Sequence, residues 1–527
     1  MSQLNNHGLT WWWKIMSNNN NEITLAFVIT IFVTIFLAIL WYKKVTISSS
    51  LFPPLPPGPR SLPIVGYLPF LTPEWPKQFV DMAHAYGPIF KFYMGSKLNV
   101  VINTPELAKE VVRDQDDAFA NRQQTVAVSV FSYGGQDIIF SDNNSSWRSL
   151  RKILVQEILN NKSLEACRFL RRNEVRKTVK TVFAKIGTPI NINEIAYLTM
   201  AKVVSSMIWD DMSIDSHLGE ELRIIASEIA DTIGLPNLSD IFPSLAWFDL
   251  QGVERDMKKQ VNKLSRVLTD IIEYRIQSNS KGSKDGVGRD GKKDFFQILL
   301  DLNDQKDPSL NIAKIKALLV DIMIAGTETT TTLIEWTMAE IMSNQHVRKR
   351  IQEELEEIVG ANNIVEESHL RKLEYLDATI KETFRLHPVN PLLLPRKPSQ
   401  DCVVGGYAVP KGCTIFLNVW SIHRDPRYWN NPLEFNPERF LMNKWDYNGK
   451  NLKFFPFGAG RRICPGIPLA EKMQMFILAS LLHSFEWSLP KGEMHVDLSE
   501  KFGITLKRRK PLIAIPSQRL SDASLYN

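Results

Sequence analysis

Residues 457–466 read Phe457-Gly458-Ala459-Gly460-Arg461-Arg462-Ile463-Cys464-Pro465-Gly466. This stretch places one cysteine between glycines, after a basic pair and just before a segment with the composition of a helix. A thiolate at Cys464 would lie near the positive end of a helix dipole, with backbone N–H groups pointing at its sulfur. A lone cysteine is most often a small buried hydrophobic residue. The surroundings of Cys464 instead favour a metal-bound thiolate.

The ten residues resemble the haem-binding loop of the cytochromes P-450, whose pattern is F-x-x-G-x-R-x-C-x-G. Its five fixed positions are filled by Phe457, Gly460, Arg462, Cys464 and Gly466. Uncommon residues at five fixed positions match by chance far more rarely than a single cysteine does. The resemblance implies a mainly α fold with small β-sheets, the cytochrome P-450 fold. It also implies that Cys464 is the axial ligand of haem b, with Phe457 packed on the cysteine side of the haem.

The bulk composition limits the class of protein. The chain has 527 residues, a net charge of +6 and four cysteines. Its length allows about three domains or one large α-rich unit. So few cysteines do not form a disulfide framework, and they fit a reducing compartment. The modest, dispersed basic charge does not indicate nucleic-acid binding, but it allows a basic face for an acidic partner or an anionic membrane.

The N-terminus predicts a membrane anchor. Residues 23–42 form an uncharged apolar run that is long enough to span a bilayer. Trp41 and Tyr42 end this run, and Lys43-Lys44 follow at once. A cleaved signal peptide is the main alternative, but its positive charge would precede the apolar run. Charge after the run favours an uncleaved single-pass transmembrane helix whose C-terminal side faces the cytosol.

A proline-rich stretch follows the predicted anchor and includes Leu55-Pro56-Pro57-Gly58-Pro59. Such a stretch predicts a stiff, extended hinge. Microsomal cytochromes P-450 show the same order of anchor, proline hinge and catalytic domain. The expected division is a lumenal tail over 1–22, an anchor over 23–42, a hinge over 43–60 and a haem domain over 61–527. The order implies a location in the endoplasmic reticulum membrane, with the catalytic domain on the cytosolic face.

Local patterns predict the elements around the cysteine loop. Residues 87–103 alternate and are β-rich, so we expect a hairpin. Helical periodicity predicts helices within 164–276, over 294–302, 312–342 and 370–386, and from 468. The proline-punctuated residues 388–396 predict an extended strand. Loop signals mark 240–252 and 278–293. We expect residues 502–505 to lie on a closing hairpin, and the basic residues 507–510 predict a solvated turn.

One further motif and two other arginines supply basic residues for the cofactor. Trp147 and Arg151 lie four apart on one face of a predicted helix, a spacing that alone indicates a solvated face with a packed tryptophan. The pair matches the family's W-x-x-x-R, which implies that both residues hold a haem propionate, since a buried carboxylate needs such partners. The same resemblance implies that Arg396 and Arg462 reach the propionates.

Residues 325–330, Ala-Gly-Thr-Glu-Thr-Thr, lie within a long predicted helix, although small and hydroxyl residues are poor helix formers. Such a segment alone would indicate a kink or a tight helix crossing. It resembles the family's [AG]-G-x-[DE]-T-[TS] pattern. The resemblance implies that Thr329 and Glu328 are the alcohol and the acid that carry protons to bound oxygen.

A third pair of motifs predicts a structural network. Glu382 and Arg385 are three residues apart, which alone would indicate a weak surface ion pair. They match the family's E-x-x-R, and Pro437-Glu438-Arg439-Phe440 matches its P-E-R-F. The resemblance implies a buried network of Glu382, Arg385 and Arg439 that locks the structure without taking part in the chemistry.

Over residues 55 to about 516 the chain is similar to the plant microsomal cytochromes P-450, nearest to the sesquiterpene and other terpenoid hydroxylases. The resemblance implies hydroxylation of a small hydrophobic substrate with dioxygen, with the Cys464 thiolate favouring O–O cleavage. Because the sequence has no strand–GxGxxG–helix unit, electrons would come from NADPH through a membrane-bound cytochrome P-450 reductase. Substrate contacts are expected from 122–133, 224–235, 318–325, 389–394 and 502–505.

Three alternatives remain open. Phenolic and flavonoid hydroxylases share much of the same framework, so the substrate could belong to that class. Relatives that rearrange peroxides use neither dioxygen nor a reductase, but they tend to lack the alcohol that Thr329 supplies. A non-catalytic haem-binding membrane protein would have no use for an intact acid–alcohol pair.

Overall fold

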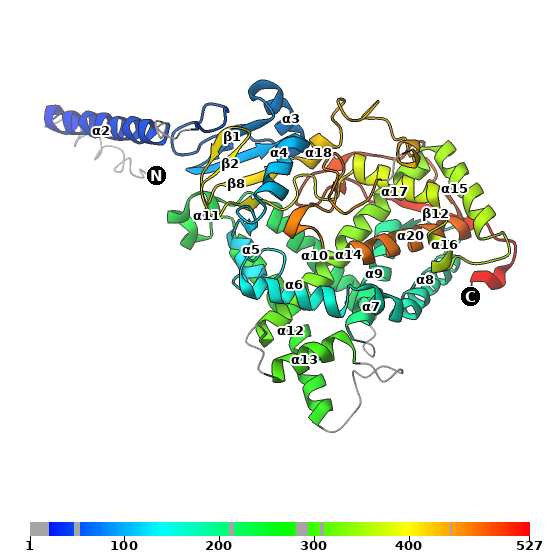
Figure 1. Cartoon of the computed structure of the whole chain (residues 1–527). Coiled ribbons are helices and arrows are strands. Elements are labelled where there is room, and N and C mark those ends of the chain that lie inside the picture. Colours follow the sequence, from blue (N-terminus) through cyan, green and yellow to red (C-terminus); the bar gives the residue numbers. More distant parts are fainter. Residues whose placement is uncertain are drawn as a thin grey trace, which may run out of the picture.

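A computed structural model describes residues 20–46, 53–209, 216–280, 293–305, 310–442 and 445–526. Within these residues, helices form the body of the domain and four small sheets complete it. The helix α2 (Asn20–Thr46) projects from one end of the body, on the side of the largest sheet (Figure 1). The expected mainly α fold with small sheets is confirmed.

The helix α2 covers the predicted anchor. Its apolar side chains from Phe27 to Leu40 are exposed, and Phe27 and Phe32 are each 70% exposed. An exposed apolar surface of this kind indicates contact with a membrane or a partner. By length and composition α14 (Ile312–Ser343) could also span a bilayer, but it is mostly buried inside the body. The predicted tail up to residue 19 and the hinge over 47–52 lie outside the described residues.

The second half of the predicted hinge is attached to the domain. The carbonyl oxygens of Pro56 and Pro57 accept hydrogen bonds from the side chain and the backbone N–H of Lys91, at 2.5 and 2.8 Å. At Gly58 an added Cβ would lie 1.9 Å from the carbonyl oxygen of Lys91, so only glycine fits there. The segment therefore runs along the first strand of the sheet. The four-part division of the chain stays a prediction.

The largest sheet brings together segments that are distant in the sequence. Its strands, in spatial order, are β1 (Ile89–Met94), β2 (Lys97–Ile102), β8 (Thr414–Leu417), β5 (Arg396–Lys397) and β3 (Asn121–Arg122). The antiparallel pair β1–β2 confirms the predicted hairpin. The register of β3 on β5 sets Arg122 directly opposite Arg396. Two arginines separated by most of the chain are thus neighbours on one edge of the sheet.

Helices on several sides pack against α14, which crosses the middle of the body (Figure 1). Among them are α9 (Ile192–Ile208), α10 (Ser216–Gly234), α12 (Val253–Ser280), α17 (Glu374–Leu386) and α20 (Ile467–Ser484). The helix α6 (Ser145–Glu157) contributes Arg151 to the site. Fully buried side chains lie along the length of α14, among them Leu318, Ile334 and Met338. A helix that is apolar on nearly all faces is a core helix. The predicted helix over 312–342 is confirmed.

The other helices complete the body. They are α3 (Trp75–Tyr86), α4 (Pro105–Lys109), α5 (Val126–Phe131), α7 (Asn161–Ala166), α8 (Arg168–Phe183), α11 (Leu238–Ile241), α13 (Phe295–Asp304), α15 (Gln345–Ile358), α16 (Glu367–Leu370), α18 (Val419–Ile422) and α19 (Glu438–Leu441). The helix predicted over 370–386 is too long at its start, because α16 ends at Leu370 and α17 begins at Glu374.

The small sheets lie at the periphery. Their strands are β4 (Ile190–Asn191), β12 (Ile513–Gln518) and β9 (Phe485–Ser488) in one sheet, β6 (Cys402–Val404) and β7 (Tyr407–Val409) in another, and β10 (Glu500–Lys501) and β11 (Lys507–Arg508) in the last. The pair β10–β11 confirms the hairpin expected around 502–505.

The strand predicted over 388–396 is wrong. Only Arg396, at its end, pairs with neighbouring strands, as part of β5. Before it the chain turns, because the N–H of Leu393 donates to the carbonyl oxygen of Asn390 at 3.0 Å and Leu393 has a φ of 51°. Prolines 388, 391 and 395 lack N–H donors, so this segment cannot form a continuous ladder.

The solvated turn predicted over 507–510 is half wrong. The side chains of Arg509 and Lys510 are 61% and 75% exposed, as expected. Lys507 and Arg508 lie in β11, and their side chains are largely buried. Lys507 contacts Glu328 in the middle of α14, and Arg508 donates to the carbonyl oxygen of Asp497. These contacts join segments far apart in the chain, so a run of basic residues does not predict them.

Candidate active site

The cysteine loop leads directly into α20. The N–H of Cys464 donates to the carbonyl oxygen of Phe457 at 3.0 Å, and the N–H of Gly466 donates to the Sγ of Cys464 at 3.3 Å. The sulfur therefore lies beside the N-terminus of α20, where the helix dipole favours a negative charge. Burial raises the pKa of the Cys464 thiol, while the Gly466 N–H and the nearby guanidinium of Arg151 lower it.

At two of the motif's glycines, neighbouring atoms lie close to where a side chain would begin. Gly460 has a φ of 69°, and an added Cβ would lie 2.0 Å from the carbonyl oxygen of Val112. A Cβ on Gly466 would lie 3.6 Å from the Sγ of Cys464, so a larger side chain would crowd the sulfur. Both positions therefore keep the loop close to its neighbours and the sulfur accessible. The ring of Phe457 packs on Phe384 of α17, with ring centroids 5.0 Å apart.

Cys464 lines a cavity of about 320 Å³ inside the domain. Much of the cavity wall is apolar, and among its side chains are Phe131, Ile229, Ile233, Val389, Leu394 and Ile504. All five segments that were expected to contact a substrate contribute to this wall, and their contact with a substrate stays a prediction. Leu392 is an exception within its segment, because it packs in the cluster around Phe79 instead.

Four arginines reach the same cavity: Arg122, Arg151, Arg396 and Arg462. Three of them are buried and donate to backbone carbonyl oxygens, Arg122 to Leu394 at 2.6 Å, Arg396 to Ala459 at 3.0 Å and Arg462 to Ala120 at 2.6 Å. Their guanidinium groups therefore have fixed positions before any anion binds.

These buried cations repel one another. Burial, together with the neighbouring Arg396, lowers the pKa of Arg462 to about 9, and burial lowers the pKa of Arg396 to about 10. The pKa of Arg122 is also lowered well below its ordinary value by burial and by Arg462. Buried cations held by neutral carbonyls need a counter-charge. The two propionates of a haem facing Cys464 would supply it, so the residues present fit that cofactor.

Trp147 and Arg151 lie on α6 as predicted, but they have different surroundings. Arg151 lines the cavity and donates to the carbonyl oxygen of Ile463, next to Cys464, at 2.5 Å. Trp147 is buried, and its indole N–H donates to the carbonyl oxygen of Ile138 at 2.9 Å. The guanidinium of Arg462 lies 4.0 Å from the centre of the Trp147 ring. In this arrangement Trp147 supports Arg462, and its own contact with a propionate stays a prediction.

Two residues at the cavity were missed by the sequence motifs. Arg122 was placed only in a substrate-contact segment, because its proximity to Arg396 depends on the β3–β5 register. Asp321, Ala325 and Thr329 follow one another at intervals of about one helical turn, so they share a face of α14. The carboxylate of Asp321 accepts a hydrogen bond from the N–H of Ile138 at 2.8 Å. Its spacing to Thr329 was the signal that could have indicated a cavity position.

Asp321 orders the loop that holds the arginines in place. The N–H of Ile138 donates to Asp321, and its carbonyl oxygen accepts hydrogen bonds from the side chains of Trp147 and Arg462. Burial raises the pKa of Asp321 well above its ordinary value, and the neighbouring Asp137 raises it further. Burial also raises the pKa of Asp137 to about 6. This acid pair therefore retains a proton more readily than surface carboxylates do.

The helix α14 passes the cavity as one continuous helix. It runs from Ile312 to Ser343, and a Cβ on Gly326 would lie 3.5 Å from a methyl group of Val204 on α9, which makes a tight crossing. The hydroxyl of Thr329 donates to the carbonyl oxygen of Ala325 at 2.7 Å. Both Thr329 and Glu328 line the cavity that Cys464 opens onto.

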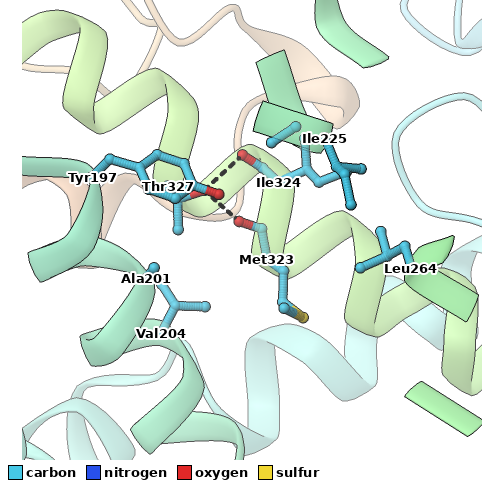
Figure 2. A pocket seen from close by; sticks show the side chains of 9 residues that line it. Tyr197, Ala201, Val204, Ile225, Leu264, Met323, Ile324 and Thr327 are labelled. Carbon is cyan, nitrogen blue, oxygen red and sulfur yellow. Dashed lines mark hydrogen bonds between the residues drawn. The ribbon is translucent and has the colours of Figure 1, made fainter. Parts of the chain in front are cut away.

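A second, smaller cavity of about 20 Å³ lies between α9, α10, α12 and α14. Figure 2 shows its side chains, including Tyr197, Ile225 and Leu264, which come from three of these helices. The hydroxyl of Thr327 is turned to the carbonyl oxygens of Met323 and Ile324, at 2.6 and 3.3 Å, so it leaves the wall apolar. A void of this size has room for about one water molecule and is too small for a substrate.

The predicted network of Glu382, Arg385 and Arg439 is assembled as expected. The two carboxylate oxygens of Glu382 accept from Arg385 at 2.7 and 2.8 Å, and one of them also accepts from Nε of Arg439 at 3.0 Å. Glu382 and Arg385 are fully buried, and Arg385 donates further to the carbonyl oxygens of His423 and Pro432. The network adjoins the site, since Phe384 between them lines the cavity.

A thiol at a helix N-terminus, opening onto a cavity ringed by buried arginines, defines a haem-thiolate protein. The sequence profile of the cytochrome P450 family matches residues 56–515. The chain therefore belongs to the cytochrome P450 family. It is a P450 monooxygenase, and its cofactor is the haem with a cysteine thiolate ligand that the family carries.

Several plant proteins are similar to this chain over most of their length. Cytochrome P450 76C1 of Arabidopsis thaliana is 37% identical over 481 residues, covering 89% of this chain and 92% of that protein. Flavonoid 3',5'-hydroxylase of Campanula medium is 35% identical over 490 residues, covering 89% and 92%. Carnosic acid synthase of Salvia pomifera is 35% identical over 472 residues, covering 88% and 93%.

Solved structures support the same assignment. A zebra fish cytochrome P450 with progesterone has a TM-score of 0.71 and 26% sequence identity to this chain. The match covers 85% of this chain and 100% of that structure.

Proposed function

We propose that this monooxygenase hydroxylates a small terpenoid, with a sesquiterpene as the first candidate, in plant specialised metabolism. The apolar wall of the cavity carries this proposal. Side chains such as Ile229, Ile233 and Leu394 offer dispersion contacts to a hydrocarbon and no hydrogen bonds. A ligand with few polar atoms would bring few groups that need hydrogen-bond partners into this cavity. Each polar group without a partner there would lower the binding free energy.

A flavonoid or another phenolic compound is the second candidate. Asn390 and Thr505 place polar atoms on the cavity wall beside Ile504, and a phenolic hydroxyl could bond to them. The side chain of Asn390 is already engaged, since its Nδ2 donates to the carbonyl oxygen of Ile504 at 2.8 Å. Fewer polar partners are therefore left for a substrate with several hydroxyls, which favours the terpenoid.

The residues on the cysteine side would hold the cofactor. In this proposal Cys464 would bind the haem iron through its sulfur. Arg122, Arg151, Arg396 and Arg462 would pair with the two propionates, with Trp147 packed against Arg462. When bound, the haem supplies the activation of dioxygen and the transfer of one oxygen atom to a C–H bond. The Cys464 thiolate donates electron density toward that reaction.

The residues on α14 would manage the protons. Reducing one oxygen atom of dioxygen to water consumes two protons, and the apolar cavity wall does not supply them. The Thr329 hydroxyl, which donates to the Ala325 carbonyl at 2.7 Å, can release a proton toward the reaction site and take up another in its place. Glu328, the residue before it on α14, would give that second proton from its carboxyl group and would then take up a proton from solvent.

Thr329→Ala tests this assignment. We expect product formed per NADPH to fall about tenfold, with hydrogen peroxide rising to match, because reduction continues when proton delivery fails. NADPH consumption should stay within about twofold of the native rate. Assays of product, peroxide and NADPH in the same reaction measure this. Thr331→Ala is the matched control, since its hydroxyl is buried two residues further on and outside the cavity wall. Unchanged coupling in Thr329→Ala would remove its role.

We also propose that electrons arrive from a membrane-bound NADPH–cytochrome P450 reductase. A groove of about 480 Å³ beside the cysteine loop is bordered by Lys109, Arg113, Lys450 and Lys453, with Glu106 and Asp446 among them. Gly449 next to it packs on Ala459 of the loop, where an added Cβ would lie 2.8 Å from the alanine Cβ. The excess of basic side chains suits an acidic docking surface on the partner.

A location in the endoplasmic reticulum membrane, with the catalytic domain on the cytosolic face, completes the proposal. Trp247, in the short 3-10 helix (Pro243–Phe248) that follows α11, is 80% exposed, and Ile64 before the sheet is 58% exposed. Gly95 in the β1–β2 turn packs against Ile241 of α11, so these exposed apolar residues belong to the end of the body that carries α2. This arrangement suits a domain that rests on the bilayer holding its anchor.

The deciding experiment uses microsomes that contain the full chain and a reductase. Panels of sesquiterpenes, other terpenoids and flavonoids are incubated with NADPH, and products are identified by mass spectrometry. We expect a sesquiterpene that gains one oxygen atom, and no product in microsomes carrying the Cys464→Ser variant. Turnover of flavonoids alone would replace the terpenoid proposal with the second candidate.

A further inference from the structure

The turn between β10 and β11 reaches the cavity, but the strands on either side of it are short. Ile504 and Thr505 of this turn are part of the cavity wall. The hairpin that carries them has two ladder pairs. A two-stranded hairpin on its own is at best marginally stable in water. The position of the turn therefore depends on contacts with other elements of the domain.

Hydrogen bonds from outside the hairpin attach this turn to the domain. Nδ2 of Asn390 donates to the carbonyl oxygen of Ile504 at 2.8 Å. The N–H of Leu506 donates to the carbonyl oxygen of Val389 at 2.8 Å, and its own carbonyl oxygen accepts from Nε1 of Trp336 at 2.8 Å. Leu506 is fully buried, so water cannot replace the indole as the partner of this carbonyl group. The N–H of Trp336 therefore satisfies a backbone group that would otherwise be buried without a partner.

Trp336 has a fixed orientation of its own. It is fully buried on α14, and it follows Leu333 of the cavity wall by about one helical turn. Its ring stacks on that of His387, with the ring centroids 3.9 Å apart and an angle of 6° between the ring planes. Nε2 of His387 lies 2.6 Å from Oε1 of Glu340, which is also on α14. These contacts set the plane of the indole, and with it the direction of the indole N–H, before any substrate binds.

The end of α10 packs closely against the same turn. A Cβ on Gly234, the last residue of α10, would lie 2.9 Å from the backbone nitrogen of Ile504. Ile229 and Ile233 of this helix line the cavity, as Ile504 does. The turn therefore forms one wall with α10, and any displacement of the turn changes the shape of the cavity at this wall.

We propose that Trp336 is a positioning residue that determines which carbon of the substrate is hydroxylated. Its indole N–H holds Leu506, and the turn in consequence presents Ile504 at a fixed depth in the cavity wall. A side chain at a fixed depth selects the orientation in which an apolar substrate fills the cavity, and so the C–H bond that lies nearest to the reaction site. The inference rests on the proposed function, because it requires that Ile504 contacts the substrate. Trp336 is not itself part of the cavity wall.

Trp336→Phe in the full-length haem-loaded protein tests whether the indole holds the turn. The variant removes the N–H and keeps an aromatic ring next to His387. We expect amide hydrogen exchange in peptides that cover 500–508 to become about fivefold faster, because the loss of one buried hydrogen bond makes opening of the turn easier. Trp487→Phe is the matched control, since Trp487 is also buried and its Nε1 donates to the carbonyl oxygen of Leu481 at 3.1 Å, away from the cavity wall. It should leave exchange in 500–508 at the native rate.

Binding of phenylimidazole tests the effect on the cavity without turnover. The imidazole nitrogen of this probe binds ferric haem, the phenyl ring occupies the cavity, and the shift of the Soret band gives the Kd. We expect both Trp336→Phe and Ile504→Ala to raise this Kd about threefold, because the apolar contact with Ile504 is weakened or lost. If Trp336 acts through Ile504, adding Trp336→Phe to Ile504→Ala should change the Kd less than about 1.5-fold further. Additive changes would overturn the proposal. Trp487→Phe should bind the probe with the native Kd.

The ratio of products separates positioning from a general structural effect. For the sesquiterpene, other terpenoid or flavonoid of the panel that the microsomes convert fastest, we expect Trp336→Phe to change the ratio of singly hydroxylated isomers about threefold or more. Haem content and NADPH consumption should stay within about twofold of native. A lower rate with the native ratio of isomers is the result of a merely structural role, and it would overturn the proposal even if exchange becomes faster.

The outcomes distinguish this inference from the function it rests on. Turnover of flavonoids alone removes the terpenoid proposal, while the exchange and Kd measurements still test Trp336. Native exchange and a native Kd in Trp336→Phe overturn the inference alone, whatever the substrate class. If Trp336→Phe fails to retain haem, benzothienylalanine introduced at position 336 replaces it, because this analogue exchanges the N–H for sulfur and keeps the size of the ring. The same results are expected of it, and native behaviour would contradict the proposal.

Discussion

Cys464→Ser is expected to abolish hydroxylation and to remove the Soret band that thiolate-ligated haem shows after reduction and binding of carbon monoxide. The Sγ of Cys464 is held by the N–H of Gly466 beside the N-terminus of α20, in a cavity with a cationic rim. A serine hydroxyl has a far higher pKa than a thiol and is a weaker donor to iron, so the electronic contribution of the thiolate is lost. Activity should fall below detection.

The measurement combines the carbon monoxide difference spectrum with product formation in the same microsomes. Cys167→Ser is the matched control, because Cys167 lies at the end of α7 and is not part of the cavity wall. We expect that variant to keep the native spectrum and at least about half of the activity. A native thiolate spectrum in Cys464→Ser would exclude this cysteine as the ligand and with it the assignment of the whole loop.

Glu382→Gln is expected to have the largest effect on stability. Glu382 is fully buried and holds the side chains of Arg385 and Arg439 at once, so its removal leaves a buried guanidinium without a counter-charge. Breaking a buried ion pair on one side costs about 3–5 kcal/mol. Domains are stable by only about 5–15 kcal/mol, so this loss would remove much of the total. The variant should unfold about 5–10 °C below the native protein.

Thermal unfolding, followed by the loss of bound haem, measures this change. Glu353→Gln is the control, because Glu353 pairs with Lys349 across 3.7 Å on the surface, where the two side chains are 65% and 80% exposed. A surface pair of this kind contributes at most about 1 kcal/mol. Equal unfolding temperatures for the two variants would show that the Glu382 network does not lock the structure. Catalysis by the folded fraction of Glu382→Gln should stay near native, because Glu382 is not part of the cavity wall.

Motifs with a local cause were predicted well. Three motifs contain residue types that reduce stability unless they have a function: the cysteine loop, the segment 325–330 and the network around Glu382. The structure places each of these motifs at or next to one cavity. The hairpin of β1 and β2 and the helix α14 follow from periodicity, which depends on neighbouring residues. The roles of the individual site residues stay predictions.

The errors occurred where distant contacts decide the structure. Residues 388–396 have the composition of a strand, yet only the end of the segment has a partner strand, and Leu393 adopts a left-handed conformation. Lys507 has the same charge as Lys510, but it lies on the inner side of the hairpin, facing Glu328. Neither outcome could be derived from the residues within a few positions of each.

By itself, the sequence determined that Cys464 is presented at a helix start, that α14 carries an acid next to an alcohol, and that an apolar helix precedes a haem domain. Backbone propensity and residue spacing depend on neighbouring residues, so they can be inferred from the sequence alone. Only the tertiary structure decided that Arg122 lies opposite Arg396, that Asp321 holds the loop at Ile138 and that Lys507 reaches Glu328. Those contacts depend on the packing of sheet edges and helix ends that the chain brings together only on folding.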